Sequence, residues 1–156
     1  MQYDYIVIGS GSGGAATAAR LSEDGKATVL LLEAGGTDRH PFIHIPVLFP
    51  HLLTNPNTTW LRKSEPVPGL NGRPMFFPSG KVLGGSSSIN GMLYIRGQAQ
   101  DYDGWRDAGN AGWGWDDVLP YFKKMEDHQN GESDFHGVGG PIAVTDTLPS
   151  NDSSYK

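Results

Sequence analysis

One stretch near the start of the chain limits the possible folds more than any other. An apolar run, residues 4–8, leads into the glycine-rich turn 9–14, and a small-residue segment and a second apolar run, 27–32, follow before Glu33. In a βαβ unit the first glycine allows a tight turn, the second lets the backbone approach a pyrophosphate, and the third lets the helix pack closely on the strand. The unpaired N–H groups of that helix then face the phosphates. The pattern predicts two strands, a helix over 15–21 and a dinucleotide site.

The acid that ends this stretch bears on which dinucleotide binds. A carboxylate is expected about 20 residues beyond the turn, where it accepts hydrogen bonds from ribose hydroxyls. Glu33 stands 19 positions after Gly14. Because a carboxylate would repel a 2'-phosphate, NADP is disfavoured relative to NAD or FAD. The motif by itself leaves NAD and FAD both open.

Length and composition exclude several classes of protein. A chain of 156 residues is long enough for one ordinary domain but too short for a cofactor domain and a full substrate domain together. The formal net charge of -5, without a run of lysines, argues against a nucleic-acid partner. No cysteine is present, which excludes disulfides and thiolate metal sites.

The distribution of apolar residues along the chain bears on the cellular location of the protein. No apolar run is long enough to be a transmembrane segment. The first predicted strand begins within a few residues of Met1, which leaves no room for a signal peptide. We therefore expect a cytoplasmic location, with peripheral association with a membrane left open.

A proline-punctuated stretch follows Glu33. Four prolines between residues 41 and 56 forbid a long helix, so we expect an extended excursion with one short apolar turn. His40 and His44 have the spacing of two metal ligands on a helix, but the prolines oppose a continuous helix and no nearby acid completes a motif. We interpret them as loop histidines and predict no metal site.

A β-hairpin is expected next. Residues 59–65 and 73–77 read as strands, and Asn71-Gly72 between them is a strong signal for a hairpin turn. Trp60 could contact a cofactor, although packing in a core is the commoner role for such an aromatic residue.

A second glycine-rich block spans residues 80–97. Gly84 and Gly85 are followed by three serines, which places bare backbone and hydroxyls at the entrance to a predicted helix, a geometry suited to a ligand rich in acceptors. A flexible linker is the alternative. Apolar residues such as Val82 and Ile89 argue against a solvated linker.

This block, continuing to Asp103, resembles the first signature of the glucose-methanol-choline (GMC) oxidoreductases, a family of FAD-dependent enzymes that oxidise alcohols. The opening residues 4–11, the turn Glu33-Ala34-Gly35 and the segments 112–115 and 119–124 resemble the same family. The likeness is greatest to its choline dehydrogenase-like branch and covers essentially the whole chain. It implies an incomplete, Rossmann-like α/β domain of the FAD/NAD(P)-binding type, with a β-hairpin and short helices inserted after the first βαβ unit.

The motifs and the resemblance together predict FAD contacts in two groups. The first group lies against the adenosine ribose and the pyrophosphate: Gly9, Gly11, Ser12, Gly13, Gly14, Glu33 and Ala34. The second lies near the dinucleotide and along the ribityl chain and flavin: Val82, Gly85, Ser86, Asn90, Gly91, Met92 and Leu93. Some relatives attach the flavin through a histidine just before the position of Asn90. Ile89 stands there in this chain, so the resemblance implies FAD bound without a covalent link.

The remaining chain predicts two helices and a strand. Asp101–Trp105 reads as a short helix, and a better one follows with Asp116 as its cap and Pro120 in its first turn. Its apolar face consists of Val118, Phe122 and Met125. Three tryptophans nearby are expected to pack rather than to stack on a ligand. Residues 140–144 are expected to start one more strand.

No catalytic residue is predicted. In the resembled family a histidine from a C-terminal region takes the hydroxyl proton while hydride passes to the flavin N5, and none of the five histidines here matches it. We expect residues 1–145 to be the N-terminal portion of the FAD-binding domain and 146–156 to begin a connection toward a substrate domain. The function predicted is the FAD-binding part of an alcohol-oxidising flavoenzyme, inactive as this chain alone. An NAD-dependent dehydrogenase domain, a non-catalytic dinucleotide-binding fragment and one chain of a two-chain enzyme are the alternatives.

Overall fold

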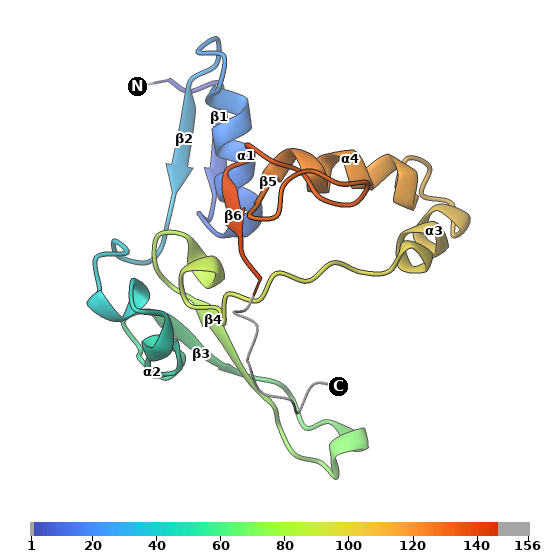
Figure 1. Cartoon of the computed structure of the whole chain (residues 1–156). Coiled ribbons are helices and arrows are strands. Elements are labelled where there is room, and N and C mark those ends of the chain that lie inside the picture. Colours follow the sequence, from blue (N-terminus) through green and yellow to red (C-terminus); the bar gives the residue numbers. More distant parts are fainter. Residues whose placement is uncertain (1, 147–156) are drawn as a thin grey trace. The chain divides into compact units, whose positions relative to one another are not determined.

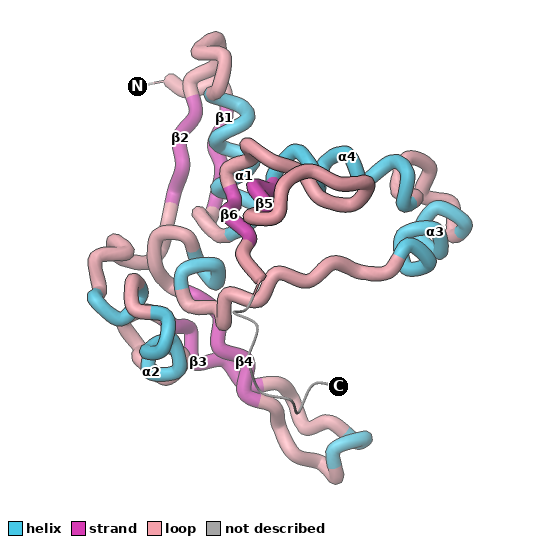
Figure 2. Tube along the Cα trace, in the orientation of Figure 1, coloured by secondary structure: helices cyan, strands magenta, loops and turns pink. Residues whose placement is uncertain are grey.

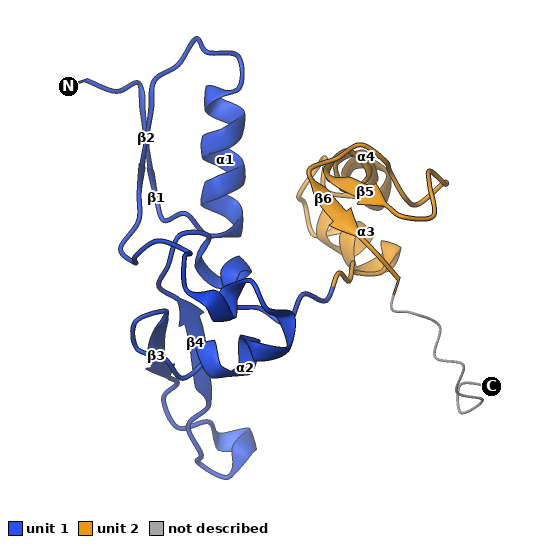
Figure 3. Cartoon of the chain, turned by 60° about the vertical axis from the view of Figure 1, so that its left-hand side comes forward, with its two compact units in different colours: residues 1–93 blue, residues 94–156 orange. Residues whose placement is uncertain are grey.

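The computed structural model describes residues 2–146 of the chain (Figure 1). The chain forms two compact units, Met1–Leu93 and Tyr94–Lys156, which are coloured separately in Figure 3. The sequence does not predict this division. The expected domain boundary at residue 145 stays a prediction, because residues 147–156 of the expected connection lie outside the described part of the chain.

The first unit begins with the predicted βαβ unit. Strand β1 (Tyr5–Ile8) pairs in parallel with β2 (Val29–Leu32), with Tyr5 opposite Val29 and Ile8 opposite Leu32. Helix α1 (Ser12–Ser22) connects them and contacts both strands. The helix starts earlier than the predicted residue 15, because Ala15 N–H donates to Gly11 O at 2.8 Å and closes the first turn. The predicted strand, helix and strand are confirmed.

The segment after β2 contains more helical turns than predicted. It contains the 3-10 turns η1 (Pro41–Ile43) and η2 (Pro46–Leu48) and the single helical turn α2 (Phe49–Leu52). A proline lies at the first or second position of each turn, where its missing N–H costs no hydrogen bond. The absence of a long helix is confirmed, but the expected extended excursion with one turn is wrong, because these prolines start turns.

The predicted hairpin is present. Strand β3 (Thr59–Lys63) pairs antiparallel with β4 (Phe76–Gly80), and η3 (Pro68–Leu70) lies in the connection. Asn71 and Gly72 have φ of 54° and 75°, and Arg73 N–H donates to Leu70 O at 3.1 Å, which is the pattern of a type I′ turn. The second strand lies later than the expected 73–77, because Val67 and Arg73 form only an isolated bridge before the ladder resumes.

The second glycine-rich block forms one short turn instead of a helix. Element η4 (Gly85–Ser88) is a 3-10 turn, and residues 89–98 form neither helix nor strand (Figure 2). Gly84, Gly85 and Met92 have φ of 90°, 56° and 57°, and left-handed residues interrupt a right-handed helix. The prediction of a helix here is wrong.

The same block belongs to the small core of the first unit. Leu52, Val82 and Ile89 form a buried cluster, against which Ile43 and Leu53 pack. The Thr59 hydroxyl donates to Leu52 O at 2.6 Å and ties the start of β3 to the end of α2. Rejection of a solvated linker is therefore confirmed for residues 82–89, whereas residues 90–93 are exposed and irregular at the end of the first unit.

The second unit contains both predicted helices. Helix α3 (Ala99–Asp107) and helix α4 (Trp115–Met125) pack through aromatic side chains, with the ring centroid of Tyr102 at 5.5 Å from Trp115 and 5.6 Å from Phe122. Packing is thus confirmed for Trp115. Trp105 and Trp113 also meet edge to face, but both are about half exposed.

The start of α4 differs from the expectation. Gly114 is the residue before the helix, and its N–H donates to the Asp117 carboxylate at 3.0 Å. Asp117 therefore closes the helix start, and Asp116 lies in the first turn instead of capping it. Pro120 lies inside the helix, where it removes one backbone hydrogen bond, so its predicted place in the first turn is wrong.

Two short strands complete the second unit. Strand β5 (Glu126–His128) pairs in parallel with β6 (Ile142–Val144). The strand expected within 140–144 is confirmed, whereas β5 has no counterpart among the predictions. No helix among the described residues is both long and apolar enough to span a bilayer.

Candidate functional site

A cavity of about 500 Å³ opens in the first unit where β1 and β2 end. Its walls bring together residues from the first glycine turn, the end of β2, the hairpin and the second glycine-rich block. They are Ile8, Gly9, Gly11, Leu32, Glu33, Ala34, Trp60, Gly80, Gly85 and Ser86. Ligands of doubly wound α/β folds bind outside the carboxyl ends of parallel strands, which is where this cavity lies.

Close backbone contacts at glycines shape the cavity. A Cβ atom on Gly14 would lie 1.8 Å from Gly9 O, so only glycine lets α1 pack against the turn after β1. A Cβ atom on Gly85 would lie 2.8 Å from Gly11 Cα, so the second block rests directly on the first. The two motifs that the sequence singles out separately therefore form one cradle, and bare backbone lines it.

Glu33 is fixed in this cradle by three protein donors. The N–H and the hydroxyl of Ser10 donate to Glu33 Oε2 at 2.9 and 2.6 Å, and Gly35 N–H donates to Oε1 at 2.8 Å. The Ser10 hydroxyl, followed by the Ser10 N–H, lowers the pKa of the Glu33 carboxyl below its usual value, although partial burial opposes the shift. Glu33 is therefore an anion with acceptor capacity left on Oε1.

The predicted cofactor residues fall into three places. Gly9, Gly11, Glu33, Ala34, Gly85 and Ser86 line the cavity. Ser12, Gly13 and Gly14 form the first turn of α1 directly after Gly11. Val82 is buried in the core, and the segment Asn90–Leu93 does not line the cavity. Which of these residues contact a cofactor stays a prediction.

Two residues of the site carried little or no signal in the sequence. Ser10 occupies the variable position between two motif glycines, and only the fold shows that it meets Glu33. Trp60 is 37% exposed and lines the cavity, so of the two roles that the sequence left open, a place beside a ligand is favoured over packing in a core. Lys81 Nζ lies 4.5 Å from its ring centroid and Arg62 Cζ lies 5.5 Å from it.

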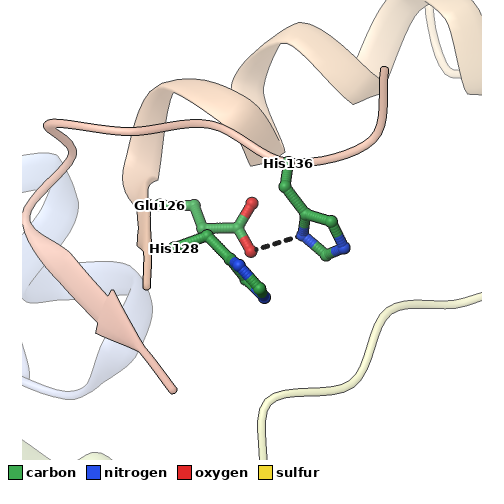
Figure 4. Close-up of side chains that lie close together, drawn as sticks. All are labelled: Glu126, His128 and His136. Carbon is green, nitrogen blue, oxygen red and sulfur yellow. Dashed lines mark hydrogen bonds and ion pairs between the residues drawn. The ribbon is translucent and has the colours of Figure 1, made fainter. Parts of the chain in front are cut away.

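A second group of polar side chains gathers in the second unit. Glu126, His128 and His136 each offer a ligand atom, and these atoms lie within 4.8 Å of one another (Figure 4). Protein donors already occupy the Glu126 carboxylate: His136 Nδ1 on Oε1 at 2.9 Å, and both Arg96 and Gly137 N–H on Oε2. Asn130 N–H donates to His128 Nδ1 at 3.3 Å. Glu126, His136 and Arg96 thus form a hydrogen-bonded charge network, against which the His128 ring packs with its centroid 4.1 Å from that of His136, and we assign no metal to the group.

Comparison with known proteins identifies the family. The profile of the GMC oxidoreductases matches residues 3–155. The chain belongs to the GMC oxidoreductase family. It is 51% identical, over 144 residues, to an oxygen-dependent choline dehydrogenase of Rhizobium etli, and the match covers 92% of this chain. The predicted resemblance to GMC enzymes and to their choline dehydrogenase-like branch is confirmed.

Solved structures of GMC-like proteins share the fold. The pyridoxine 4-oxidase of Mesorbium loti matches 91% of this chain with a TM-score of 0.85 and 40% identity. An FAD-dependent oxidoreductase of Chaetomium thermophilum matches 92% with a TM-score of 0.78 and 35% identity. The predicted incomplete Rossmann-like α/β FAD-binding domain is confirmed, and these relatives favour FAD over the NAD alternative.

The match covers only part of each relative. This chain spans about a quarter of their length, 26% of the choline dehydrogenase and 28% of the pyridoxine 4-oxidase. The part of the GMC relatives that this chain matches is therefore the part that corresponds to the glycine cradle and Glu33.

Proposed function

We propose that the cavity of the first unit binds FAD without a covalent link and that the whole protein oxidises the CH–OH group of an alcohol. The observation that carries this proposal is the meeting of two glycine motifs and an anionic Glu33 where parallel strands end. Membership in the GMC family supports the activity.

The residues present fit the diphosphate and the ribose of the adenosine diphosphate half of FAD. The start of α1 offers free N–H groups and the positive end of its dipole to the diphosphate, and Gly11 and Gly13 leave backbone open beside it, since a Cβ on either would meet nothing within 4 Å. Glu33 would accept hydrogen bonds from the adenosine ribose. The Trp60 face offers apolar contact at the cavity wall.

Non-covalent binding of FAD is supported by the residue that precedes Asn90. Ile89 stands there, is 2% exposed and packs with Leu52 and Val82. An aliphatic side chain in a core offers no nucleophile for attachment of a flavin.

The chemistry divides between cofactor and protein. When bound, FAD supplies the flavin N5 that takes the hydride of the alcohol. The residues described here bind and orient the dinucleotide, and we assign no catalytic base among residues 1–156. Asn90 to Leu93 stay proposed contacts of the ribityl chain and flavin, and the cytoplasmic location stays a prediction.

Choline is the first substrate to test, because the curated relatives at about half identity are named oxygen-dependent choline dehydrogenases. The name pyridoxine 4-oxidase for a structural relative makes pyridoxine the second candidate alcohol. Flavin reduction by each alcohol under anaerobic conditions would identify the substrate without a known electron acceptor. Reduction by neither compound would contradict this choice of alcohols.

The cofactor proposal is tested by the absorption spectrum of the protein purified at its native length. We expect a yellow protein whose flavin passes into the supernatant when acid precipitates the polypeptide, and we expect this flavin to be FAD by chromatography. Flavin that stays in the precipitate would contradict non-covalent binding. A colourless protein that binds NAD instead would contradict the proposed cofactor.

A further inference from the structure

Ser10 is a buried hydroxyl residue at the centre of the cradle. It follows Gly9, whose φ is 91°, and precedes α1, so it lies in the turn after β1. Only 1% of its surface is exposed. A side chain with so little exposure does not offer its hydroxyl to a bound ligand, so any role in binding must act through its neighbours.

The hydrogen bonds of Ser10 join two parts of the cavity wall. Its hydroxyl donates to Glu33 Oε2 at 2.6 Å and accepts from Gly84 N–H at 3.0 Å. One donated and one accepted bond engage the hydroxyl on both sides. The same oxygen atom thus contacts the acid that ends β2 and the loop that opens the second glycine block, 74 residues away in the sequence.

The geometry restrains the Glu33 carboxylate. Both donors of Ser10, its N–H and its hydroxyl, contact Oε2, which fixes the rotation of the carboxylate. Oε1 accepts from Gly35 N–H and keeps capacity for another donor. On the other side, the bond to Gly84 N–H holds the loop from which Gly85 and Ser86 reach the cavity.

We infer that Ser10 is a positioning residue for FAD: its hydroxyl sets the orientation of Glu33 and ties it to the 84–86 loop before the cofactor binds. This inference rests on the proposed function of the cavity. It assigns to Ser10 no direct contact with FAD.

Removal of the hydroxyl should affect binding in a defined way. In Ser10→Ala, Glu33 loses its shortest hydrogen bond and Gly84 N–H loses its acceptor. We expect FAD to bind about ten- to a hundredfold more weakly, the scale of a lost hydrogen bond to a charged group. The pH below which FAD affinity falls should also rise, because the hydroxyl is the main group that lowers the pKa of Glu33.

The experiment is titration of flavin-free protein of native length with FAD, at several pH values. Thr17→Ala is the matched control, because Thr17 lies on α1 and its exposed hydroxyl donates only to Gly13 O, at 2.8 Å. Its FAD affinity should equal that of the wild type. Ser10→Cys keeps nearly the same volume with a weaker donor, and it is the second variant to use if Ser10→Ala does not fold. It should show the same two changes in smaller degree.

A double-mutant cycle with Glu33→Gln separates positioning from general loosening of the fold. If Ser10 acts through Glu33, Ser10→Ala should cost much less affinity in the Glu33→Gln background than in the wild type. Additive losses, or an unchanged affinity and pH profile in Ser10→Ala, would overturn the inference while the cavity remains an FAD site. Failure of the wild type to bind FAD would overturn the proposed function and this inference with it.

Discussion

At the scale of single residues, Glu33 is prepared for a ligand by its neighbours. Hydrogen bonds from Ser10 and Gly35 stabilise the carboxylate and keep its pKa below the ordinary value of 4.5. A lowered pKa means that the charge persists as pH falls past the point at which an exposed glutamate is protonated. FAD affinity should therefore stay constant from neutral pH down to about that point, and fall only at lower pH.

Substitution of Glu33 tests its role in binding. Glu33→Ala should weaken FAD binding by about 1 to 3 kcal/mol, the scale of lost hydrogen bonds to a charged group. Glu23→Ala changes the net charge equally, but its side chain pairs with Arg20 at 2.7 Å at the end of α1 and does not line the cavity. FAD titration of both variants provides the comparison. Equal affinities for the two variants would remove the role assigned to Glu33.

Glu126 is the other carboxylate whose surroundings matter. Burial alone would raise its pKa, but hydrogen bonds from His136 and Gly137 and the charge of Arg96 outweigh burial and lower it. The ionised form is thus stabilised in the folded unit. Its contribution to stability is complete above pH 4.5, the usual carboxyl pKa, and is lost as pH falls through the lower pKa of the folded state.

Glu126→Gln should destabilise the protein strongly. The Arg96 side chain is only 11% exposed and would lose its buried anion, which typically costs about 3 to 5 kcal/mol. Glu132→Gln is the control, because Glu132 is 67% exposed and its pair with Lys123 should contribute about 0 to 1 kcal/mol. Urea denaturation measures both. Similar losses in the two variants would show that the network contributes no more than a surface ion pair.

The sequence predicted some of these residues and missed others for a physical reason. Glu33 could be predicted from the sequence, because its spacing from a glycine turn follows from the length of a βαβ unit. The roles of Ser10 and Glu126 could not be predicted, because they depend on partners that only the tertiary fold brings within hydrogen-bonding distance. The choice between a core role and a cofactor contact for Trp60 stayed open, because exposure cannot be read from one aromatic residue on a strand.

At the scale of elements, predictions hold where local pattern decides and fail where the backbone is unusual. The βαβ unit, the hairpin with Asn71-Gly72 and both later helices are confirmed, because periodicity and turn chemistry act over short distances. The helix expected after Gly85 fails, because Gly84, Gly85 and Met92 adopt left-handed angles and Ile89 instead packs in the core.

Gly14→Ala tests the close approach that joins α1 to β1. Its Cβ would overlap Gly9 O, so the free energy of unfolding should fall by about 1 to 3 kcal/mol or more. In Gly13→Ala, one residue earlier in the same helix, the new Cβ meets nothing within 4 Å, and the variant should be neutral or about 0.5 to 1 kcal/mol more stable. Thermal unfolding of the flavin-free variants measures both. Equal stability would contradict the close contact.

At the scale of the whole molecule, little apolar surface is buried for the length of the chain. Among the described residues, the buried hydrophobic ones are Ala18, Leu52, Val82, Ile89 and Tyr102. Strand residues that would normally be covered remain exposed: Ile6 at 60%, Ile8 at 83% and Leu32 at 46%. The two-stranded sheet of β1 and β2 therefore presents unpaired edges and apolar faces that further strands or helices would cover.

The isolated 156-residue chain should accordingly be marginally stable. Differential scanning calorimetry without flavin or any partner should show a broad transition of low enthalpy, because few contacts are lost on unfolding. A sharp, cooperative transition would contradict this expectation. The resemblance to GMC enzymes implied an FAD domain of this kind. The division into two units was not predicted, because residue 93 lies inside the glycine-rich block 80–97, whose apolar residues argued against a linker.

The most direct test of the central claim is an experimental structure of the protein of native length with bound FAD. We predict the diphosphate against the turn between Gly9 and Gly13, the adenosine ribose within hydrogen-bonding distance of Glu33, and Gly85 beside the dinucleotide. FAD bound elsewhere, with this cavity filled by side chains or solvent, would contradict the claim.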